Sequence, residues 1–359
     1  MDPNSTIHDN TFRHAIRERK HVLSEKVFDL LIKENPSIGE RMTAEYKERC
    51  IEDIGYHLMY LADAVHVDSY HLFQSYVAWA KTLFESLGVS NDSFVKSLDV
   101  IKRVIGETLP ADTVQSAAAY LERAIEEFPS IPSEHPTALG PDNPLSGLGS
   151  RYLDTLLQGE RNAAAEMILS AVERGTPITD LYLHVFQAVQ IELGRLWQMN
   201  KVSVAEEHYC TAATQLIMSR LYPYIFNEKK NGRVFLGACV GDELHEIGVR
   251  MISDFFELEG WDTYFLGANT PQQAILDMVK TKKPHILGIG VTIAYNIYNV
   301  ESIIKAVRSQ DELESVKILV GGYPFNLDAA LWKKVGADGY ARNAQEAVQT
   351  AEKLIGQAG

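Results

Sequence analysis

The sequence predicts a multidomain protein of mixed class. It combines an all-helical N-terminal domain, a four-helix bundle and a C-terminal doubly wound parallel sheet of the Rossmann or flavodoxin type. Apolar residues recur at helical spacing up to about residue 226, whereas strand-like and helical segments alternate from residue 232 onward. A proline-rich stretch between residues 129 and 150 separates the two helical parts. We therefore expect domains at 1–130, 149–226 and 232–359, with a linker at 131–148.

Composition limits the kind of partner that this chain can have. At 359 residues the chain is too long to form a single ordinary hydrophobic core, and a hydrophobic share of 46% supports a folded chain throughout. The net charge of −14 disfavours a general nucleic-acid or anionic-membrane binder. Cys50, Cys210 and Cys239 are too few and too scattered for a disulfide framework, and we interpret them as packing residues. Without a signal peptide or a membrane-spanning run, the chain is expected to be cytoplasmic.

The first 130 residues predict about five helices, interrupted by turn signals such as Asn35-Pro36 and Leu109-Pro110. Two of these helices carry apolar stripes that must be buried against partners, one from Ile51 to Val65 and one from Tyr70 to Phe84. Aromatic and histidine side chains are dense in this pair. An ordinary aromatic core explains most of them, and the alternative is a ligand slot. By residue type alone, the candidates for lining such a slot are Tyr60, His71, Tyr76 and Trp79.

Residues 149–226 predict the four helices of the bundle. Leu153, Leu156 and Leu157 begin an apolar face, and three further helical patterns follow at 163–172, 179–199 and 204–222. The turns between them are short, at Gln158-Gly159, at 175–177 and at Asn200. Short connections imply antiparallel neighbouring helices, and hence a bundle.

From residue 232 the pattern alternates, with strands expected near 233–240, 262–266, 285–292, 316–320 and 338–341. Right-handed crossovers place the carboxyl ends of parallel strands at one edge of the sheet, where ligands bind. His245 lies just past the first strand, and Glu243 can orient its imidazole toward a metal. Thr292 ends the third strand, and the Gly321-Gly322 pair ends the fourth. A lone surface histidine at a helix start is the alternative for His245.

These residues resemble the cobalamin-binding domain of methionine synthase, corrinoid proteins and B12 mutases. That family shows Asp-x-His-x-x-Gly, then Ser-x-Leu, then Gly-Gly, and the matching positions here are Glu243, His245, Gly248, Thr292, Ala294, Gly321 and Gly322. The resemblance implies that the histidine binds cobalt from below, in place of the cofactor's own base. It also implies that the small residues leave a slot for the nucleotide tail. Further contacts are expected from the same edge, at Asp242, Leu244, Glu246 and Tyr340.

The segment from Gly194 to His208 resembles the Trp-x9-Glu-His signature of light-sensing adenosylcobalamin repressors. Trp197, Glu207 and His208 match it at full spacing, which implies an aromatic lid and a polar handle for an adenosyl upper ligand, with Val204 as a further contact. Gln198 departs from the pattern, because those repressors carry there a histidine that takes over cobalt after illumination. An amide oxygen is a poor ligand for cobalt beside imidazole, so His208 or water would have to replace it.

The N-terminal domain departs from those repressors as well, because it shows no basic recognition helix for DNA. A helical domain followed by the light-sensing cobalamin module resembles photocobilins, in which a globin-like domain holds biliverdin. The resemblance implies a second, light-absorbing tetrapyrrole in residues 1–130. No cysteine lies in a recognisable attachment context, so noncovalent binding is expected.

Two functions from different classes follow from these resemblances. The first is a light sensor without turnover, in which adenosylcobalamin photolysis, with biliverdin as a second pigment, signals by conformational or oligomeric change to a separate protein. A homo-oligomer, either a dimer or a tetramer, is expected with it. The alternative is a corrinoid methyl carrier that serves a methyltransferase. A radical mutase subunit is disfavoured because the chain lacks a substrate barrel.

Overall fold

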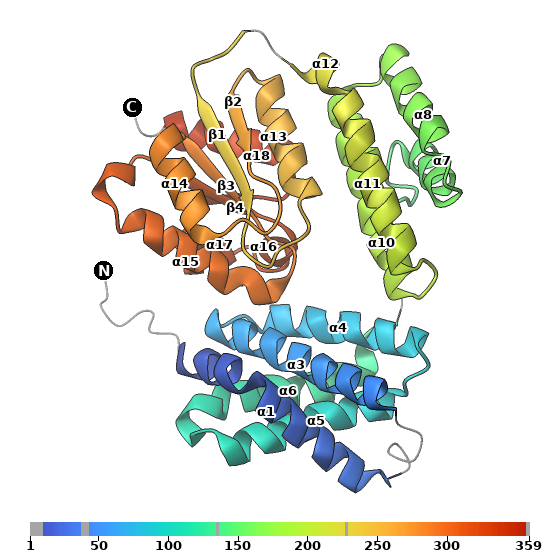
Figure 1. Cartoon of the computed structure of the whole chain (residues 1–359), viewed down its shortest axis with the longest axis vertical. Helices are drawn as coiled ribbons and strands as arrows, with labels where there is room; N and C mark the ends of the chain where they lie inside the picture. Colours follow the sequence, from blue (N-terminus) through green and yellow to red (C-terminus); the bar gives the residue numbers. More distant parts are fainter. Residues whose placement is uncertain (1–9, 37–42, 134–135, 227–228, 357–359) are drawn as a thin grey trace. The chain divides into compact units, whose positions relative to one another are not determined.

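The computed structural model describes residues 10–36, 43–133, 136–226 and 229–356. The chain divides into two compact units, Met1–Glu134 and His135–Gly359. The first unit is helical, and the second contains helices and a five-stranded parallel sheet, which confirms the predicted fold class (Figure 1). Within the described ranges, none of the helices combines the length and the apolar character needed to cross a membrane.

The first unit is built from five long helices in its described part: α1 (Asn10–Glu34), α3 (Ala44–His66), α4 (Tyr70–Ser86), α5 (Asn91–Thr108) and α6 (Ala111–Glu127). Hydroxyl caps start two of them. Thr43 accepts a hydrogen bond from the amide of Tyr46 at the start of α3, and Ser90 does the same for Ser93 at α5. The apolar stripe of α3 is buried as predicted, as is that of α4 except at its last member, the half-buried Phe84.

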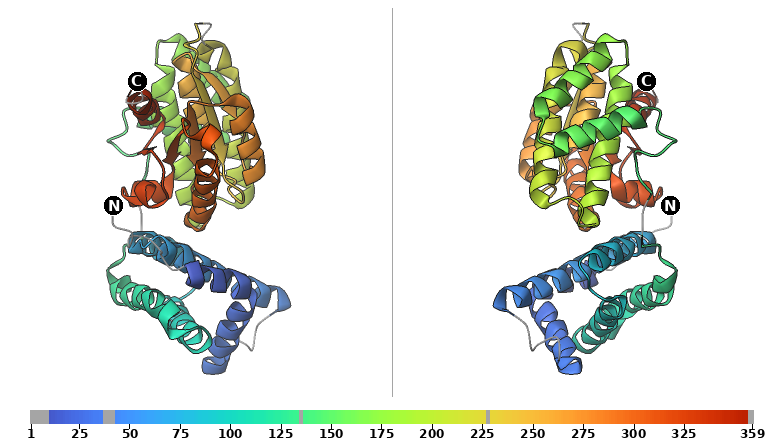
Figure 2. Two further views of the ribbon diagram at one scale, coloured as in Figure 1. Left: turned by 90° about the vertical axis from the view of Figure 1, so that its left-hand side faces the viewer. Right: turned by 90° about the vertical axis from the view of Figure 1, so that its right-hand side faces the viewer.

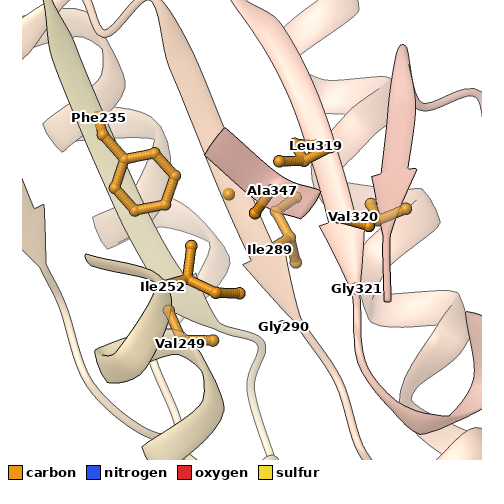
Figure 3. Close-up of a pocket in the computed structure, with 11 residues that line it drawn as sticks. Phe235, Val249, Ile252, Ile289, Gly290, Leu319, Val320, Gly321 and Ala347 are labelled. Carbon is orange, nitrogen blue, oxygen red and sulfur yellow. The ribbon is translucent and has the colours of Figure 1, made fainter. Parts of the chain in front are cut away.

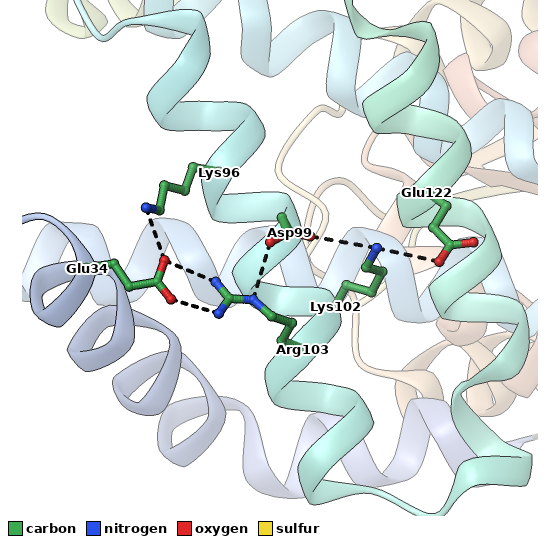
Figure 4. Close-up of polar contacts among 6 residues, drawn as sticks. All are labelled: Glu34, Lys96, Asp99, Lys102, Arg103 and Glu122. Atoms are coloured by element: carbon green, nitrogen blue, oxygen red, sulfur yellow. Dashed lines mark hydrogen bonds and ion pairs between the residues drawn. The ribbon is translucent and has the colours of Figure 1, made fainter.

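Ion pairs connect these helices both in the core and at the surface. The Arg13 guanidinium lies 2.8 Å from the Asp63 carboxylate, and both side chains are buried. At the surface, an ion-pair network joins α1, α5 and α6 (Figure 4), and its members are Glu34, Lys96, Asp99, Lys102, Arg103 and Glu122. Exposed pairs contribute little to stability, so the apolar core carries most of it.

The second unit begins with the predicted bundle, whose helices are α7 (Ser146–Leu157), α8 (Arg161–Glu173), α10 (Gln187–Gln198) and α11 (Val204–Arg220). The short α9 (Ile178–Leu181) runs into α10 through a π-helical turn at Tyr182–Phe186. Ser203 and Glu206 form a capping box that fixes the start of α11. Part of the expected linker is packed on this bundle, because the Thr137 hydroxyl donates to Glu192 at 2.9 Å.

The sheet has the strand order β2-β1-β3-β4-β5, and all pairs are parallel. Its strands are β1 (Val234–Cys239), β2 (Asp262–Phe265), β3 (Ile286–Gly290), β4 (Lys317–Gly321) and β5 (Gly339–Ala341). Helices cover both faces (Figure 2), with α13 (Ile247–Leu258) and α18 (Ala344–Gly356) on one side and α14 (Gln272–Lys282) and α15 (Ile297–Arg308) on the other. The shorter helices α12 (Tyr222–Ile225), α16 (Tyr323–Leu327) and α17 (Leu331–Lys334) complete the unit.

Helix α13 belongs to the sheet and to the bundle at once, because it lies between them (Figure 1). Its residues Ile247, Met251 and Phe255 are buried in the hydrophobic core that the bundle helices form. A polar row that begins at the N-cap of this helix, Glu246, is hydrogen-bonded to the bundle: Gln215 to Glu246 at 3.0 Å, Arg250 to Ser219 at 2.7 Å and Tyr182 to Asp254 at 2.7 Å. These contacts place the bundle beside the carboxyl end of β1.

Candidate functional site

The candidate site lies at the carboxyl edge of the sheet, where the strand order reverses between β1 and β3. In sheets of this order, ligands bind at that switch point. The turn after β1 carries His245, and it is held in place by its neighbour, the loop after β2. There the amide of Asp242 donates to the Asn269 side chain at 2.9 Å, and the amide of Asn269 donates to the Glu243 carbonyl at 2.8 Å. Asp242 adopts a left-handed conformation with φ 66°, which aspartate tolerates better than most residues.

Glu243 is the buried centre of this turn. Its carboxylate is fully buried and accepts hydrogen bonds from the His245 ring nitrogen Nδ1 at 2.5 Å and from the His245 amide at 3.1 Å. The amides of Thr292 and Ile293 donate to its other oxygen at 2.8 and 2.9 Å. Glu243 therefore joins the ends of β1 and β3, and Thr292 contributes its backbone N–H to that joint.

The ionised form of Glu243 is favoured despite its burial. Burial acts to raise the pKa of this carboxyl, but the hydrogen bonds from His245 and from the two loop amides hold the pKa below its ordinary value. The same contact raises the pKa of His245, against the opposing effect of burial, and the negative charges of Glu243 and Glu207 act in the same direction. With a carboxylate on Nδ1, the second ring nitrogen, Nε2, is the one left for a metal.

The donor set fits a corrinoid better than a free metal ion. In the described part of the chain, no three His, Cys, Asp or Glu side chains come together as a metal site would require. One carboxylate-oriented imidazole, with a side chain 58% exposed, suits a metal that brings its other ligands within a macrocycle. Leu244, beside it, is 71% exposed, so an apolar group also faces outward at this turn.

Two glycines of β3, Gly288 and Gly290, form a glycine floor under α13, next to the His245 turn (Figure 3). A Cβ at Gly290 would come within 2.1 Å of the Val249 side chain, and one at Gly288 within 2.6 Å of the Phe235 ring. Figure 3 shows the side chains of Phe235, which lies on β1, and of Val249 and Ile252, which lie on α13, beside this part of β3. The remaining cavity is only about 20 Å³, which is room for about one water molecule. A nucleotide tail would therefore enter only if Phe235 or α13 moved.

The other residues expected at the lower slot lie along the same edge, and their contact with a cofactor stays a prediction. Gly248 has open space around the position of a Cβ. Ala294 is buried in the turn before α15, and Tyr340 is half-buried in β5. Gly322 is required by the fold itself, because its φ is 110° and a Cβ there would lie 1.8 Å from the Val291 carbonyl oxygen.

The end of α10 and the first turns of α11 carry the residues expected above the cofactor. Glu207 is half-buried, and its carboxylate accepts from the Thr211 hydroxyl at 2.8 Å and contacts His208 Nδ1 at 2.5 Å. The Thr211 hydroxyl also reaches the Gln190 side-chain oxygen at 2.8 Å. Trp197 is half-buried at the end of α10, Val204 is exposed, and Gln198 is packed inside the bundle with only 4% exposure.

Sequence reasoning missed several polar residues that build this region. The Thr211 hydroxyl lies between the side-chain oxygens of Glu207 and Gln190, and Asn269 holds the His245 turn. Thr211 lies four residues after Glu207 on one helix, and that spacing could have suggested their contact. Nothing in the sequence pairs Asn269 with Asp242, because they lie on loops after different strands.

The bilin candidates of the first unit lie in a cluster of rings, except for one. Tyr60 stacks on Tyr76 with ring centres 3.8 Å apart, and Trp79 lies 6.1 Å from Tyr76 at an interplanar angle of 22°. Tyr76 is buried, and its hydroxyl lies 2.6 Å from His57 Nδ1. Burial lowers the pKa of His57 to about 4, so the ring is neutral near pH 7. His71 is exposed.

Three family patterns match separate parts of the chain. Residues 233–349 and 148–222 each match a family described as a B12 binding domain, and residues 14–128 match the family described as phycobilisome protein. The chain therefore contains B12-binding domains in its second unit and a phycobilisome-type, globin-like helical domain in its first.

Relatives of the chain are corrinoid proteins. Dimethylamine corrinoid protein 1 of Methanosarcina mazei is 27% identical over 202 residues, covering 53% of this chain and 89% of that protein. A corrinoid protein of Desulfitobacterium hafniense is 22% identical over 208 residues, covering 56% and 94%. The structure of the Methanosarcina barkeri monomethylamine corrinoid protein aligns with a TM-score of 0.52 at 18% identity, covering 58% and 99%, which shows a shared fold.

These findings support corrinoid binding and correct the ranking of the two functional hypotheses. The matched relatives are named as corrinoid proteins, so they favour the methyl-carrier alternative. These corrinoid proteins give no support to light sensing, to the adenosyl form of the cofactor or to biliverdin.

Proposed function

We propose that the second unit binds a corrinoid with His245 as the lower axial ligand of cobalt, and that the protein is a methyl carrier for a separate methyltransferase. A bound corrinoid would supply a cobalt centre that makes and breaks a bond to carbon. Glu243 would hold the His245 ring in one orientation and tautomer, and the glycine floor under α13 would take the nucleotide tail once Phe235 or α13 had moved. The carboxylate–imidazole pair at the sheet edge carries this proposal, together with the corrinoid relatives.

A carrier of this kind needs no catalytic residue of its own. The described site offers a ligand, a buried carboxylate and apolar surface, and the chemistry would be completed by a partner enzyme. The methyl donor and acceptor would be small molecules that reach the cobalt in partner proteins. This exchange would require the bundle to uncover the upper face of the corrinoid. The hydrogen bonds between α11 and the α13 region would have to allow the bundle to move in that way.

The test of the cobalt ligand is electron paramagnetic resonance of the full chain, loaded with cobalamin and reduced to cobalt(II). An axial nitrogen-14 splits the cobalt lines into triplets, and nitrogen-15 splits them into doublets. Protein labelled with nitrogen-15 histidine should therefore give doublets, and His245→Ala should lose them. His184→Ala, which removes a half-buried imidazole from the same unit, is the matched control. Triplets from the labelled protein would mean that the cofactor keeps its own base, and the proposal would fail.

A light sensor is the second candidate, and the phycobilisome match favours it. That match covers residues 14–128, in the unit that holds the stacked rings of Tyr60 and Tyr76. A flat tetrapyrrole needs an apolar slot with stacking rings, and a methyl carrier needs no such domain. Under this proposal Trp197 and Glu207 would contact an adenosyl ligand, and biliverdin would bind the first unit without a covalent bond. Self-association of the chain would then transmit the signal.

Two measurements on the full chain separate the candidates. The first is titration with biliverdin, where a red-absorbing band at one pigment per chain supports the sensor. The second compares adenosylcobalamin with methylcobalamin in the wild type and in Trp197→Ala. Loss of an aromatic lid costs on the order of a few kcal/mol of binding free energy, and only the affinity for adenosylcobalamin would fall by that amount. Absence of pigment binding, with equal losses for both cofactors, would leave the methyl carrier.

A further inference from the structure

Helix α11 carries an apolar stripe on its outward side, made of Ala205, Tyr209, Ala212 and Leu216. These residues recur at intervals of four, three and four, which places them on one side of the helix. All four are exposed, Tyr209 by 37% and Leu216 by 47%. The opposite side of α11, which includes Ile217, is buried in the core of the bundle. A helix that is apolar on both sides is normally covered on both, so the stripe indicates a further partner.

The exposed apolar surface extends beyond the stripe at both ends of α11. At the first turns, a cavity of about 250 Å³ opens beside Ala205 and Tyr209, and Leu156 and Leu157 of α7 form its other wall. At the far end, three aromatic side chains of α12 and its C-cap are about half exposed: Tyr222, Tyr224 and Phe226. Six of the fourteen large apolar side chains exposed in the described chain lie within residues 204–226. This concentration marks an interaction site, because singly scattered apolar residues are ordinary.

The stripe does not overlap the proposed corrinoid site. Gln215 faces α13, because its side chain donates to Glu246 at 3.0 Å. Leu216 is the next residue and is turned by roughly 100° around the helix axis. A partner on the stripe therefore leaves the side of α11 that faces α13 free, and the inference drawn from the stripe does not depend on a bound corrinoid.

The charges near the ends of α11 select the occupant of the stripe. Glu206 lies in the first turn and Arg220 in the last. If a second α11 packs antiparallel about a two-fold axis near Ala212, Tyr209 lies opposite Leu216 and Glu206 lies opposite Arg220, since both pairs are centred on residues 212–213. A parallel second copy would instead place like charges together, which repel each other. The small side chain of Ala212 allows the two helices to approach closely at the axis.

We propose that the stripe of α11 is a two-fold interface, at which two copies of this chain pair antiparallel with Ala212 at the axis. An ion pair between Glu206 and Arg220 closes each end of the interface and sets the orientation of the helices. Leu216 of the second copy lies on Tyr209, beside the cavity that α7 borders, and burial of these side chains supplies the affinity. The stripe thereby gives the self-association of this chain a defined surface.

Sedimentation velocity of the full chain without cofactor tests this surface. At micromolar concentration the wild type should sediment with twice the chain mass of 40.2 kDa. Leu216→Glu should sediment as a monomer, because it places a charge in the apolar contact. Val22→Glu changes a residue of the first unit that is similarly exposed, at 53%, so it is the matched control and should stay dimeric. Both replaced side chains are about half exposed, so neither change opens a core.

Two results of this measurement would overturn the proposal. A monomeric wild type would mean that the stripe is left for a different protein. A Leu216→Glu chain with the mass of the wild type would place the interface elsewhere. The nitrogen-15 doublets of cobalt(II) report on His245 separately, so the interface and the corrinoid site can fail independently of each other.

Cysteine cross-linking tests the antiparallel register. Packed helices lie about 8–10 Å apart and their Cα atoms lie about 2.3 Å from each axis, so facing residues at the two-fold axis come within the roughly 7 Å that a disulfide spans. Ala212→Cys should therefore yield a covalent dimer under mild oxidation. Ala205→Cys, an exposed alanine of the same stripe, is the matched control, because its two copies would lie about 21 Å apart along the helices.

The wild type sets the background of this experiment, because it contains Cys50, Cys210 and Cys239. Cross-linking of Ala205→Cys to the same extent as Ala212→Cys would contradict the antiparallel pairing. A dimeric Ala212→Cys chain that forms no covalent dimer would contradict it as well.

Discussion

Replacement of Glu243 by glutamine tests how this carboxylate orients His245, with little change in shape. The amide oxygen can still accept from the amides of Thr292 and Ile293, which now bond at 2.8 and 2.9 Å. The NH₂ group then faces His245 Nδ1, where the carboxylate accepts at 2.5 Å in the wild type. That NH₂ group would oppose two donors, the His245 ring and the His245 amide, which lies 3.1 Å from the same oxygen, and only the ring could change tautomer or turn.

The expected loss follows from the kind of bond removed. A hydrogen bond to a charged group contributes about 1.5–3 kcal/mol, and partners of a metal-binding histidine typically contribute about 10–100-fold in metal affinity. We therefore expect Glu243→Gln to lower corrinoid affinity by about 30-fold, which corresponds to about 2 kcal/mol. The pKa of His245 should also fall, because the hydrogen bond to Glu243 is the main cause that raises it.

Affinity is measured by absorbance titration of the full chain with methylcobalamin, and the nitrogen-15 splitting of the cobalt(II) form shows whether His245 stays bound. Glu312→Gln is a suitable control, because it removes one exposed carboxylate elsewhere in the same unit. Unfolding by urea must show that the variant remains folded under the titration conditions. Wild-type affinity together with wild-type splitting would refute the orienting role of Glu243.

Three further predictions concern stability. In the folded protein the pKa of His57 is about 4, below its ordinary value of 6.5, because burial disfavours the charged ring. The stability that the neutral ring contributes to the fold is therefore present above pH 6.5 and is lost as the pH falls toward 4. His57→Gln should remove about 3 kcal/mol of that acid dependence, read from hydrogen exchange in α3 and α4; equal pH profiles would contradict it. Gly322→Ala should cost about 3 kcal/mol or more, because of its φ of 110° and the nearby Val291 carbonyl, and an unchanged urea midpoint would refute this. Tyr182→Phe should lose about 1.5–3 kcal/mol with its bond to Asp254, whereas no change in thermal midpoint would show that this bond contributes nothing.

The sequence by itself determined the architecture and the position of the motif that we propose as the source of the lower ligand. Apolar stripes at helical spacing predicted α3 and α4, and alternating segments predicted a parallel sheet, because these periodicities depend on local geometry alone. His245 was placed at a strand's carboxyl end because its motif directly follows an apolar run. The pairing of His245 with Glu243 could also be predicted, since the two residues lie two positions apart in one turn.

Only the tertiary structure decided which distant groups meet. Glu243 reaches the amides of Thr292 and Ile293 because β1 and β3 are neighbours in the sheet, and no local pattern encodes that contact. Likewise, the burial of Gln198 and the exposure of His208 depend on how α10 and α11 pack. The resemblance implied a slot for the nucleotide tail beside the sheet, but in the structure Phe235 and Val249 fill the space over Gly288 and Gly290. Side-chain packing across elements is a property of the assembled fold, so it cannot be inferred from spacing along the chain.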